Sequence, residues 1–204
     1  MEYDNRVKTR SLRRIIGLAI IIVAVGIFAY RAGWVKPLNP SLFMKNEPGS
    51  YAVKTVLDGD TIIVDMHGVD ETVRFIGIDT PETHKPNTPV ECYGPNAATY
   101  TKSKLEGTRV RLIADRLTTN RDRYNRLLRY VVTDDGVYMN EYLVQNGYAF
   151  AYAFPFAKSQ SYSDEMQKAR TEKRGLWGLC TPTQNAATGQ WHSNPLNTVE
   201  QTAN

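Results

Sequence analysis

The fold is decided by one stretch of sequence, Arg74-Phe75-Ile76-Gly77-Ile78-Asp79-Thr80-Pro81-Glu82-Thr83. It opens as a strand, in which Arg74 points to the opposite face from its apolar neighbours. The strand ends at Asp79-Thr80-Pro81, because proline cannot continue a ladder of hydrogen bonds and disfavours helix in the residue before it. One arginine and two carboxylates therefore lie at a strand end and in the loop after it. Carboxylates suit a hard cation and a guanidinium suits a phosphate, although an ordinary strand-to-turn junction with solvated charges has the same pattern.

Length and composition set the class of protein. The chain has 204 residues, of which 42% are hydrophobic and 23% charged, and this fits one globular domain of about 100–150 residues with extensions. A formal net charge of +4 permits a polyanionic partner without requiring one. The two cysteines, Cys92 and Cys180, are far apart, and the three histidines form no cluster. The sequence therefore excludes the usual cysteine and histidine spacings of a zinc site.

A basic flank and an apolar run open the chain. Residues 1–14 carry five Lys or Arg side chains, and residues 15–35, which begin with an uninterrupted apolar run, follow them. The run from Ile15 to Tyr30 would be about 24 Å long as a helix, slightly short of a bilayer core of about 30 Å, and residues 32–35 can extend it. We predict a transmembrane signal anchor at the cell membrane, with the flank in the cytoplasm and the domain outside. A cleaved signal peptide, which would give a secreted protein, is the alternative.

Residues 36–49 contain three prolines and are predicted to be a linker, and residues 50–180 are predicted to be the folded domain. Alternating apolar residues predict five short strands, at 51–57, 61–66, 72–78, 109–114 and 126–133. Helix start and stop signals predict helices at 94–106 and 139–146, and a last helix that begins with a capping box at Ser161. Together they predict an α+β fold, an OB-type β-barrel of five strands with about three packed helices. Residues 181–204, rich in Asn, Thr, Gln and Ala, are predicted to be a disordered tail.

A run of aromatic residues at alternate positions follows the second helix, between Tyr148 and Phe156. Packing at a sheet edge is the main interpretation. A surface on which nucleic-acid bases stack is the alternative.

Two further stretches carry groups that suit phosphate chemistry. Asp58-Gly59-Asp60-Thr61 places carboxylates in a turn, and if the second and third strands pair, Asp60 converges with Asp79. Such an oxygen-only site favours calcium over zinc. Asp122-Arg123-Tyr124-Asn125-Arg126 supplies a second arginine at the start of a strand. A cation and two guanidinium groups could neutralise charge on a phosphodiester while a free carboxylate takes a proton from water.

The combination resembles the staphylococcal nuclease (thermonuclease) family over residues 51–177. The motifs that carry the resemblance occur in the family's order: Asp58-Gly59-Asp60-Thr61, the stretch from Arg74 to Thr83, Tyr93-Gly94-Pro95-x-Ala97, Asp122-Arg123-Tyr124-Asn125-Arg126 and Gly175-Leu176-Trp177. The resemblance implies an OB-fold nuclease that uses one Ca²⁺ ion to cut DNA and RNA. It further implies cleavage of the 5′ oxygen–phosphorus bond, which leaves 3′-phosphate ends.

The resemblance also implies roles for individual residues. Asp60 and Asp79 would bind calcium through their side chains, and Thr80 through its carbonyl oxygen. Arg74, Glu82 and Arg126 would be catalytic: the arginines would clamp the phosphate, and Glu82 would act as general base or position the attacking water. Tyr124 would contact the nucleotide, with Tyr152 near a second substrate-side tyrosine. Asn125 replaces a glycine of the best-known member, and asparagine tolerates the left-handed conformation that glycine often supplies.

Three further expectations concern the context of the domain. An even cysteine count in an extracytoplasmic domain predicts a disulfide between Cys92 and Cys180. Nucleic acid is the expected partner, besides the membrane, and the protein is expected to be a monomer. A non-catalytic nucleic-acid-binding module is the alternative function, but degenerate copies of the family are expected to lose carboxylates or arginines that this chain retains. A calcium-dependent adhesion or scaffold module would explain the cation site but not the two arginines.

Overall fold

The computed structural model describes residues 25, 49–84 and 88–196 of the chain. The predicted flank, transmembrane anchor and linker, residues 1–49, lie outside the described residues except at positions 25 and 49. Within the part of the chain that is described, no helix combines the length and hydropathy needed to cross a bilayer. The anchor and the linker therefore stay predictions.

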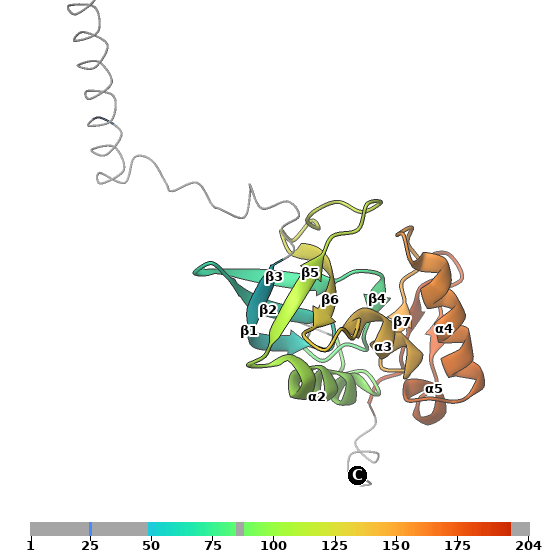
Figure 1. The fold of residues 1–204 in the computed structure, drawn as a ribbon. Helices are drawn as coiled ribbons and strands as arrows, with labels where there is room; N and C mark the ends of the chain where they lie inside the picture. Colours follow the sequence, from blue (N-terminus) through green and yellow to red (C-terminus); the bar gives the residue numbers. More distant parts are fainter. Residues whose placement is uncertain (1–24, 26–48, 85–87, 197–204) are drawn as a thin grey trace, which may run out of the picture. The chain divides into compact units, whose positions relative to one another are not determined.

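The centre of the domain is a closed barrel of five strands in the order β1-β2-β3-β6-β5 (Figure 1). The first three strands form an antiparallel meander, as predicted, and β5 pairs antiparallel with both β1 and β6. A parallel pairing between β3 and β6 closes the barrel. The bounds are β1 (Ser50–Asp58), β2 (Thr61–Met66), β3 (Val69–Phe75), β5 (Arg109–Ile113) and β6 (Leu127–Thr133). The predicted barrel of five strands is confirmed.

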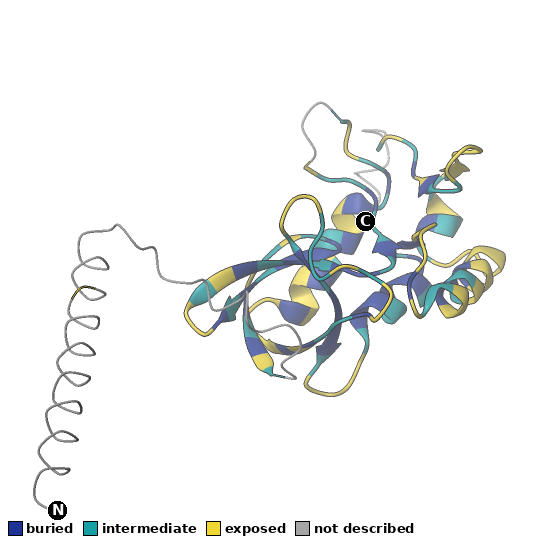
Figure 2. Ribbon diagram, turned by 90° about the horizontal axis from the view of Figure 1, so that it is seen from above, coloured by how far each residue is buried: buried dark blue, intermediate teal, exposed yellow. Residues whose placement is uncertain are grey.

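Alternate residues of the barrel strands point inward and form the core. Val73 and Phe75 of β3 and Ile62 and Val64 of β2 are almost fully buried, as the period of two along a strand requires. Figure 2 shows buried residues along the strands and exposed residues on turns and on the outer surfaces of the helices. The alternating apolar residues of the sequence thus line the barrel interior.

In the described part of the chain, α2 and α3 pack on the barrel, and α4 and the short α5 lie beyond α3 and β7 (Phe150–Ala151) (Figure 1). Helix α2 packs against β1, and α3 packs against α4. The bounds are α2 (Gly94–Leu105), α3 (Met139–Gln145), α4 (Ser159–Thr171) and α5 (Leu176–Leu179). The predicted capping box at Ser161 is wrong: α4 begins two residues earlier, after Lys158, and no side chain caps it. The earlier start follows from a turn in which the Ser159 N–H donates to the Phe156 carbonyl.

The third strand also ends earlier than predicted. It stops at Phe75, because Gly77 adopts a left-handed conformation with φ of 77° and turns the chain. Beyond this turn, β4 (Ile78–Asp79) pairs with β7 (Phe150–Ala151) instead of continuing the barrel. The decisive stretch of sequence is therefore two strands separated by a glycine turn.

The predicted disordered tail from residue 181 is wrong for residues 181–196. This segment contains the paired strands β8 (Thr183–Gln184) and β9 (Trp191–His192). Trp191 is buried and its ring meets the Trp177 ring edge-on, with centroids 5.1 Å apart. A single large aromatic side chain thus holds a polar segment whose composition alone indicated disorder. Residues 197–204 lie outside the described residues.

A buried amide joins α3 to the end of the parallel strand pair. The Asn140 side chain is fully buried; its Nδ2 donates to the carbonyl oxygens of Ile76 (2.9 Å) and Arg129 (3.2 Å). Its Oδ1 accepts from the Val131 N–H at 2.8 Å. Buried backbone groups that lose a partner are costly, so this amide fixes the point at which the chain leaves β3.

We predict that Asn140→Ala lowers the free energy of unfolding by about 3 kcal/mol, because the Ile76 carbonyl after β3 and the buried Val131 N–H of β6 lose this partner. Urea unfolding followed by circular dichroism measures this loss. Asn146→Ala is the control, since the Asn146 amide donates to the Tyr142 carbonyl at the nearby end of α3 and not across strands. Equal losses in the two variants would contradict the role given to Asn140.

A buried carboxylate joins the loop after β5 to β6 and to the start of α4. Asp115 accepts hydrogen bonds from the Tyr130 hydroxyl, from the Leu117 N–H at 2.6 Å and from the Ala157 N–H at 2.8 Å. Burial alone would raise the pKa of Asp115, but these donors outweigh burial and lower the pKa. A carboxyl with a lowered folded-state pKa contributes stability above its unfolded pKa of about 3.9, and loses it as the pH falls through the folded pKa.

We therefore predict that Asp115→Asn reduces stability at neutral pH by about 2 kcal/mol and flattens the acid limb of the stability curve. Urea unfolding at a series of pH values from about 7 to 2 measures both effects. The exposed Asp164→Asn variant should keep the wild-type slope. Parallel acid limbs for wild type and Asp115→Asn would refute the prediction.

Candidate functional site

The predicted site residues Asp60 and Arg74 lie opposite each other at one end of the barrel. The register of β2 and β3 pairs Thr61 with Arg74, so the turn before β2 places Asp60 beside the arginine. The Phe75 N–H donates to the Asp60 carbonyl at 2.9 Å, which continues the ladder one step further. Asp60 is 4% exposed, so its carboxylate is almost completely removed from water.

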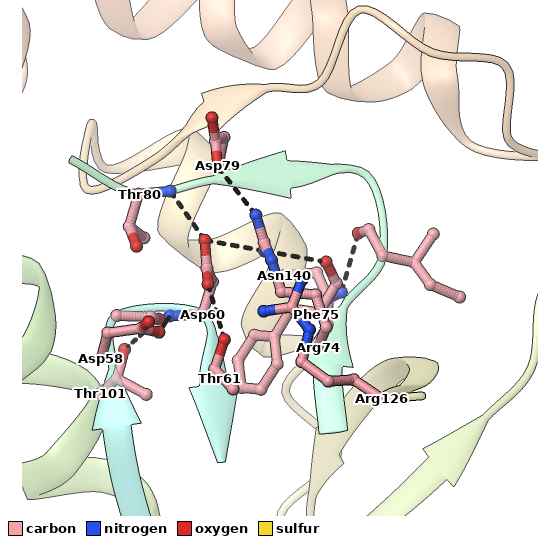
Figure 3. Close-up of polar contacts among 12 residues, drawn as sticks. Asp58, Asp60, Thr61, Arg74, Phe75, Asp79, Thr80, Thr101, Arg126 and Asn140 are labelled. Atoms are coloured by element: carbon pink, nitrogen blue, oxygen red, sulfur yellow. Dashed lines mark hydrogen bonds and ion pairs between the residues drawn. The ribbon is translucent and has the colours of Figure 1, made fainter. Parts of the chain in front are cut away.

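Arg74 lies between two carboxylates (Figure 3). Its Nη1 is 2.7 Å from Asp60 Oδ2, and its Nη2 is 2.8 Å from Asp79 Oδ1. The Thr80 N–H also donates to Asp60 Oδ2, at 2.9 Å. The structure thus brings together four of the predicted residues, two on strands β3 and β4 and two in the segments next to strands: Arg74, Asp79, Asp60 and Thr80.

The glycine turn after β3 brings Asp79 to this position. A Cβ atom at Gly77 would come within 2.4 Å of the Phe156 ring, and the left-handed φ disfavours a side chain there in any case. The pairing of Asp79 with Phe150 then fixes the direction of the chain. Glycine is therefore required for Asp79 to reach Arg74.

Negative charge exceeds positive charge at this centre. Burial raises the pKa of Asp58, and the neighbouring charge of Asp60 raises it further. Burial also raises the pKa of Asp79, where Arg74 opposes the shift and Asp60 adds to it. Burial alone would lower the pKa of Arg74, but the charges of Asp60 and Asp79 outweigh it and raise the pKa. Three carboxylates thus surround one guanidinium in a place where water screens them poorly.

The donor set fits a divalent hard cation. Asp60 and Asp79 offer carboxylate oxygens and Thr80 offers a carbonyl, and the surplus negative charge is what such an ion would neutralise. Among the described residues, no three His, Cys, Asp or Glu side chains are grouped to hold an ion by themselves. Two carboxylates and a carbonyl are a smaller set, which suits an ion that keeps water among its ligands.

Glu82 lies at the start of the loop that leaves the site. Its Oε1 accepts from the N–H groups of Thr83 and His84, at 3.1 and 3.2 Å. Its own N–H donates to Glu91 Oε2 at 3.0 Å, and the Glu91 N–H donates to the Glu82 carbonyl at 2.8 Å. Glu91 closes the base of the loop and adds negative charge near Asp79. Sequence reasoning missed Glu91, because no motif marks it.

Arg126 is held by Asp122, a residue to which no separate role was assigned from the sequence. Asp122 Oδ2 accepts from Arg126 Nε at 2.7 Å, and its Oδ1 accepts from the backbone N–H groups of Tyr124 and Arg126. Asn125 between them has a φ of 66°, which confirms the expected left-handed conformation. The parallel pairing of Val73 with Leu127 places the start of β6 beside the strand that carries Arg74.

The two predicted substrate-side tyrosines are exposed. Tyr124 is 65% exposed, and the Arg126 guanidinium lies 5.4 Å from its ring centroid. Tyr152 is 44% exposed, and its N–H donates to the carbonyl of Gly77, in the turn that leads to Asp79. In the aromatic run, Phe150 and Phe156 are buried whereas Tyr152 and Phe154 face outward. Packing therefore explains half of the run, and the exposed half still allows base stacking.

The predicted disulfide between Cys92 and Cys180 is confirmed. The two Cα atoms are 5.9 Å apart and the bridge spans 88 residues of sequence. Cys92 directly follows Glu91, and Cys180 directly follows α5. The bridge therefore ties the end of the Glu82 loop to the C-terminal part of the domain.

The fold and site together define a barrel protein with an acidic, arginine-containing centre at one end of its strands. The sequence profile described as Staphylococcal nuclease homologue matches residues 72–178, and the chain belongs to this family. It is 47% identical over 159 residues to a thermonuclease of Staphylococcus intermedius, covering 78% of this chain and 91% of the relative. It is 42% identical over 167 residues to a thermonuclease of Staphylococcus hyicus, covering 79% of this chain and 95% of the relative. Endonuclease YncB of Bacillus subtilis is 37% identical over 125 residues, 59% of this chain and 58% of that protein.

We predict that the double variant Cys92→Ser, Cys180→Ser loses about 3 kcal/mol of unfolding free energy, because its unfolded chain is no longer restricted by a long loop. Chemical unfolding with and without a thiol reductant measures the loss. Reductant should destabilise the wild type by a similar amount and leave the variant unchanged. A wild type that is equally stable in reductant would contradict the prediction.

Proposed function

We propose that this chain is a calcium-dependent endonuclease that hydrolyses phosphodiester bonds of DNA and RNA. The observation that carries the proposal is the placement of Arg74 between Asp60 and Asp79 in a buried, acidic site. Membership of the staphylococcal nuclease family and the thermonuclease relatives support it. Cleavage of the 5′ oxygen–phosphorus bond with 3′-phosphate products is part of the proposal.

In this proposal Asp60, Asp79 and the Thr80 carbonyl would hold Ca²⁺. When bound, the ion would supply positive charge at a non-bridging phosphate oxygen. Arg74 is already ordered by its two carboxylate partners, so its guanidinium can meet a phosphate without further loss of side-chain freedom. The Arg126 Nε–H donates to Asp122, and the terminal nitrogens, which have no hydrogen bond among the described residues, would meet the phosphate. The two arginines would stabilise the charge that develops in the transition state.

Glu82 is the proposed general base. Its carboxylate accepts only from two backbone N–H groups of its own loop, at 3.1 and 3.2 Å, among the hydrogen bonds of the described residues. It can therefore orient a water molecule and take its proton while the leaving 5′ oxygen departs. Tyr124 and Tyr152 are exposed and would contact the nucleotides on either side of the scissile bond.

The location of the enzyme is also part of the proposal. The Cys92–Cys180 disulfide is typical of proteins outside the reducing cytoplasm. An extracytoplasmic domain, held by the N-terminal segment or released by its cleavage, is consistent with the bridge. We propose that the domain acts as a monomer there.

A non-catalytic nucleic-acid-binding module is the competing function. It would need the barrel and the exposed tyrosines but not the carboxylate–arginine centre. A binding module has no reason to retain one buried and two partly buried carboxylates around one arginine, because such an arrangement is costly without a cation. This cost favours the enzyme.

The test is release of acid-soluble nucleotides from single-stranded DNA by the purified protein, with calcium and then with a chelator. We expect release only with calcium, and a fall of about 10²- to 10⁴-fold in Glu82→Gln, which removes the base. Glu165→Gln is the matched control, because Glu165 lies on α4 and pairs with Lys168. Folded protein that binds DNA but releases nothing in calcium would reject the enzyme in favour of the binding module.

A further inference from the structure

The C-terminal hairpin, residues 181–196, is packed onto the base of the Glu82 loop. The Cys92 N–H donates to the Asn194 carbonyl at 2.7 Å, and the Leu196 N–H donates to the Val90 carbonyl at 2.7 Å. Asn194 Oδ1 accepts from the Thr181 N–H at 2.7 Å. With the disulfide one residue before it and Trp191 buried within it, this hairpin is a fixed part of the domain.

One side chain of the hairpin reaches the centre of the site. Gln190 Nε2 is 3.2 Å from Asp79 Oδ2, across a separation of 111 residues in sequence. Its Oε1 accepts from the Ala153 N–H at 3.1 Å, next to the exposed Tyr152. A glutamine amide carries both a donor and an acceptor, so one side chain holds a carboxylate and a backbone N–H together.

The backbone of Gln190 is itself fixed by the hairpin. The Asn185 N–H donates to the Gln190 carbonyl at 2.9 Å, and Gln184 Nε2 donates to the Gly189 carbonyl at 2.8 Å. Asn185 Oδ1 also accepts from backbone N–H groups in the hairpin loop. The Gln190 amide is therefore presented from a rigid turn.

We propose that Gln190 is a positioning residue of the active site, which orients the Asp79 carboxylate for calcium and the Tyr152 segment for substrate. Arg74 holds one Asp79 oxygen and Gln190 the other, so the carboxylate plane is fixed from both sides. Groups that orient metal ligands in this way typically change metal affinity 10- to 100-fold when they are removed. This inference rests on the proposed function, since it takes Asp79 as a calcium ligand.

The hairpin lies beyond residues 72–178, which the family profile matches. The carboxylates and arginines can therefore be read from family motifs, whereas Gln190 can be found only from the folded chain. With Gln190, the site extends into a segment that was predicted from the sequence to be a disordered tail.

The experiment is calorimetric titration of the full-length, oxidised protein with calcium chloride. We expect Gln190→Ala to weaken the calcium Kd about tenfold, because Asp79 regains rotational freedom. We also expect a raised KM for single-stranded DNA, because the Tyr152 segment loses its anchor. The kcat of Gln190→Ala should equal the wild-type kcat once calcium is saturating. Circular dichroism should show an unchanged fold, since Gln190 lies at the half-buried surface.

Gln160→Ala is the matched control, because it removes the same kind of amide from a hydrogen bond to the Asp164 carboxylate on α4. It should leave the calcium Kd and KM at wild-type values. An unchanged or tighter Kd in Gln190→Ala would overturn the inference, and so would an equal loss in Gln160→Ala. A wild type that binds no calcium would reject the metal site of the proposed function, and with it this inference. Wild-type binding that Gln190→Ala does not alter would reject the inference alone.

Discussion

The site depends on where the chain is made to leave the barrel. Asn140 binds the Ile76 carbonyl and backbone groups in the middle of β6 from a position that water does not reach. A neutral amide can satisfy donor and acceptor at once, so it closes the parallel β3–β6 pair without adding charge beneath an acidic centre. The chain then turns at Gly77 and returns as β4. Without this fixed exit, Asp79 would have no defined position relative to Arg74.

The fixed exit has an electrostatic consequence. It brings Asp79 to Asp60 and Asp58, and their pKa shifts record that the carboxylates are crowded and poorly solvated. One arginine compensates only part of this charge. In the proposed calcium site, a bound cation would relieve this imbalance. The crowded carboxylates lower the stability of this end of the barrel, and the apolar core of the barrel offsets that cost.

Much of this arrangement could be predicted from the sequence. The alternation in β2 and β3 predicted the meander, and with it the approach of Asp60 to Asp79. Local motifs were sufficient there because the residues belong to neighbouring strands. Glu91 and Asp122 were not assigned roles, because each acts through hydrogen bonds to backbone groups whose positions only the fold determines. Local motifs therefore predicted which residues meet at this strand end, but not the groups that hold these residues in place.

Composition gave the wrong prediction for the C-terminal segment, because contacts with residues distant in sequence order it. A polar segment cannot form a core alone, and by that measure residues 181–196 should be disordered. Trp191 changes the balance, since its ring packs against Trp177 and under the Arg170 guanidinium. The disulfide at Cys180 keeps the segment near the loop, which lowers the entropy lost when it docks. A cross-link and one aromatic anchor are therefore enough to order a polar hairpin. Once the hairpin is ordered, a polar side chain such as Gln190 can reach Asp79.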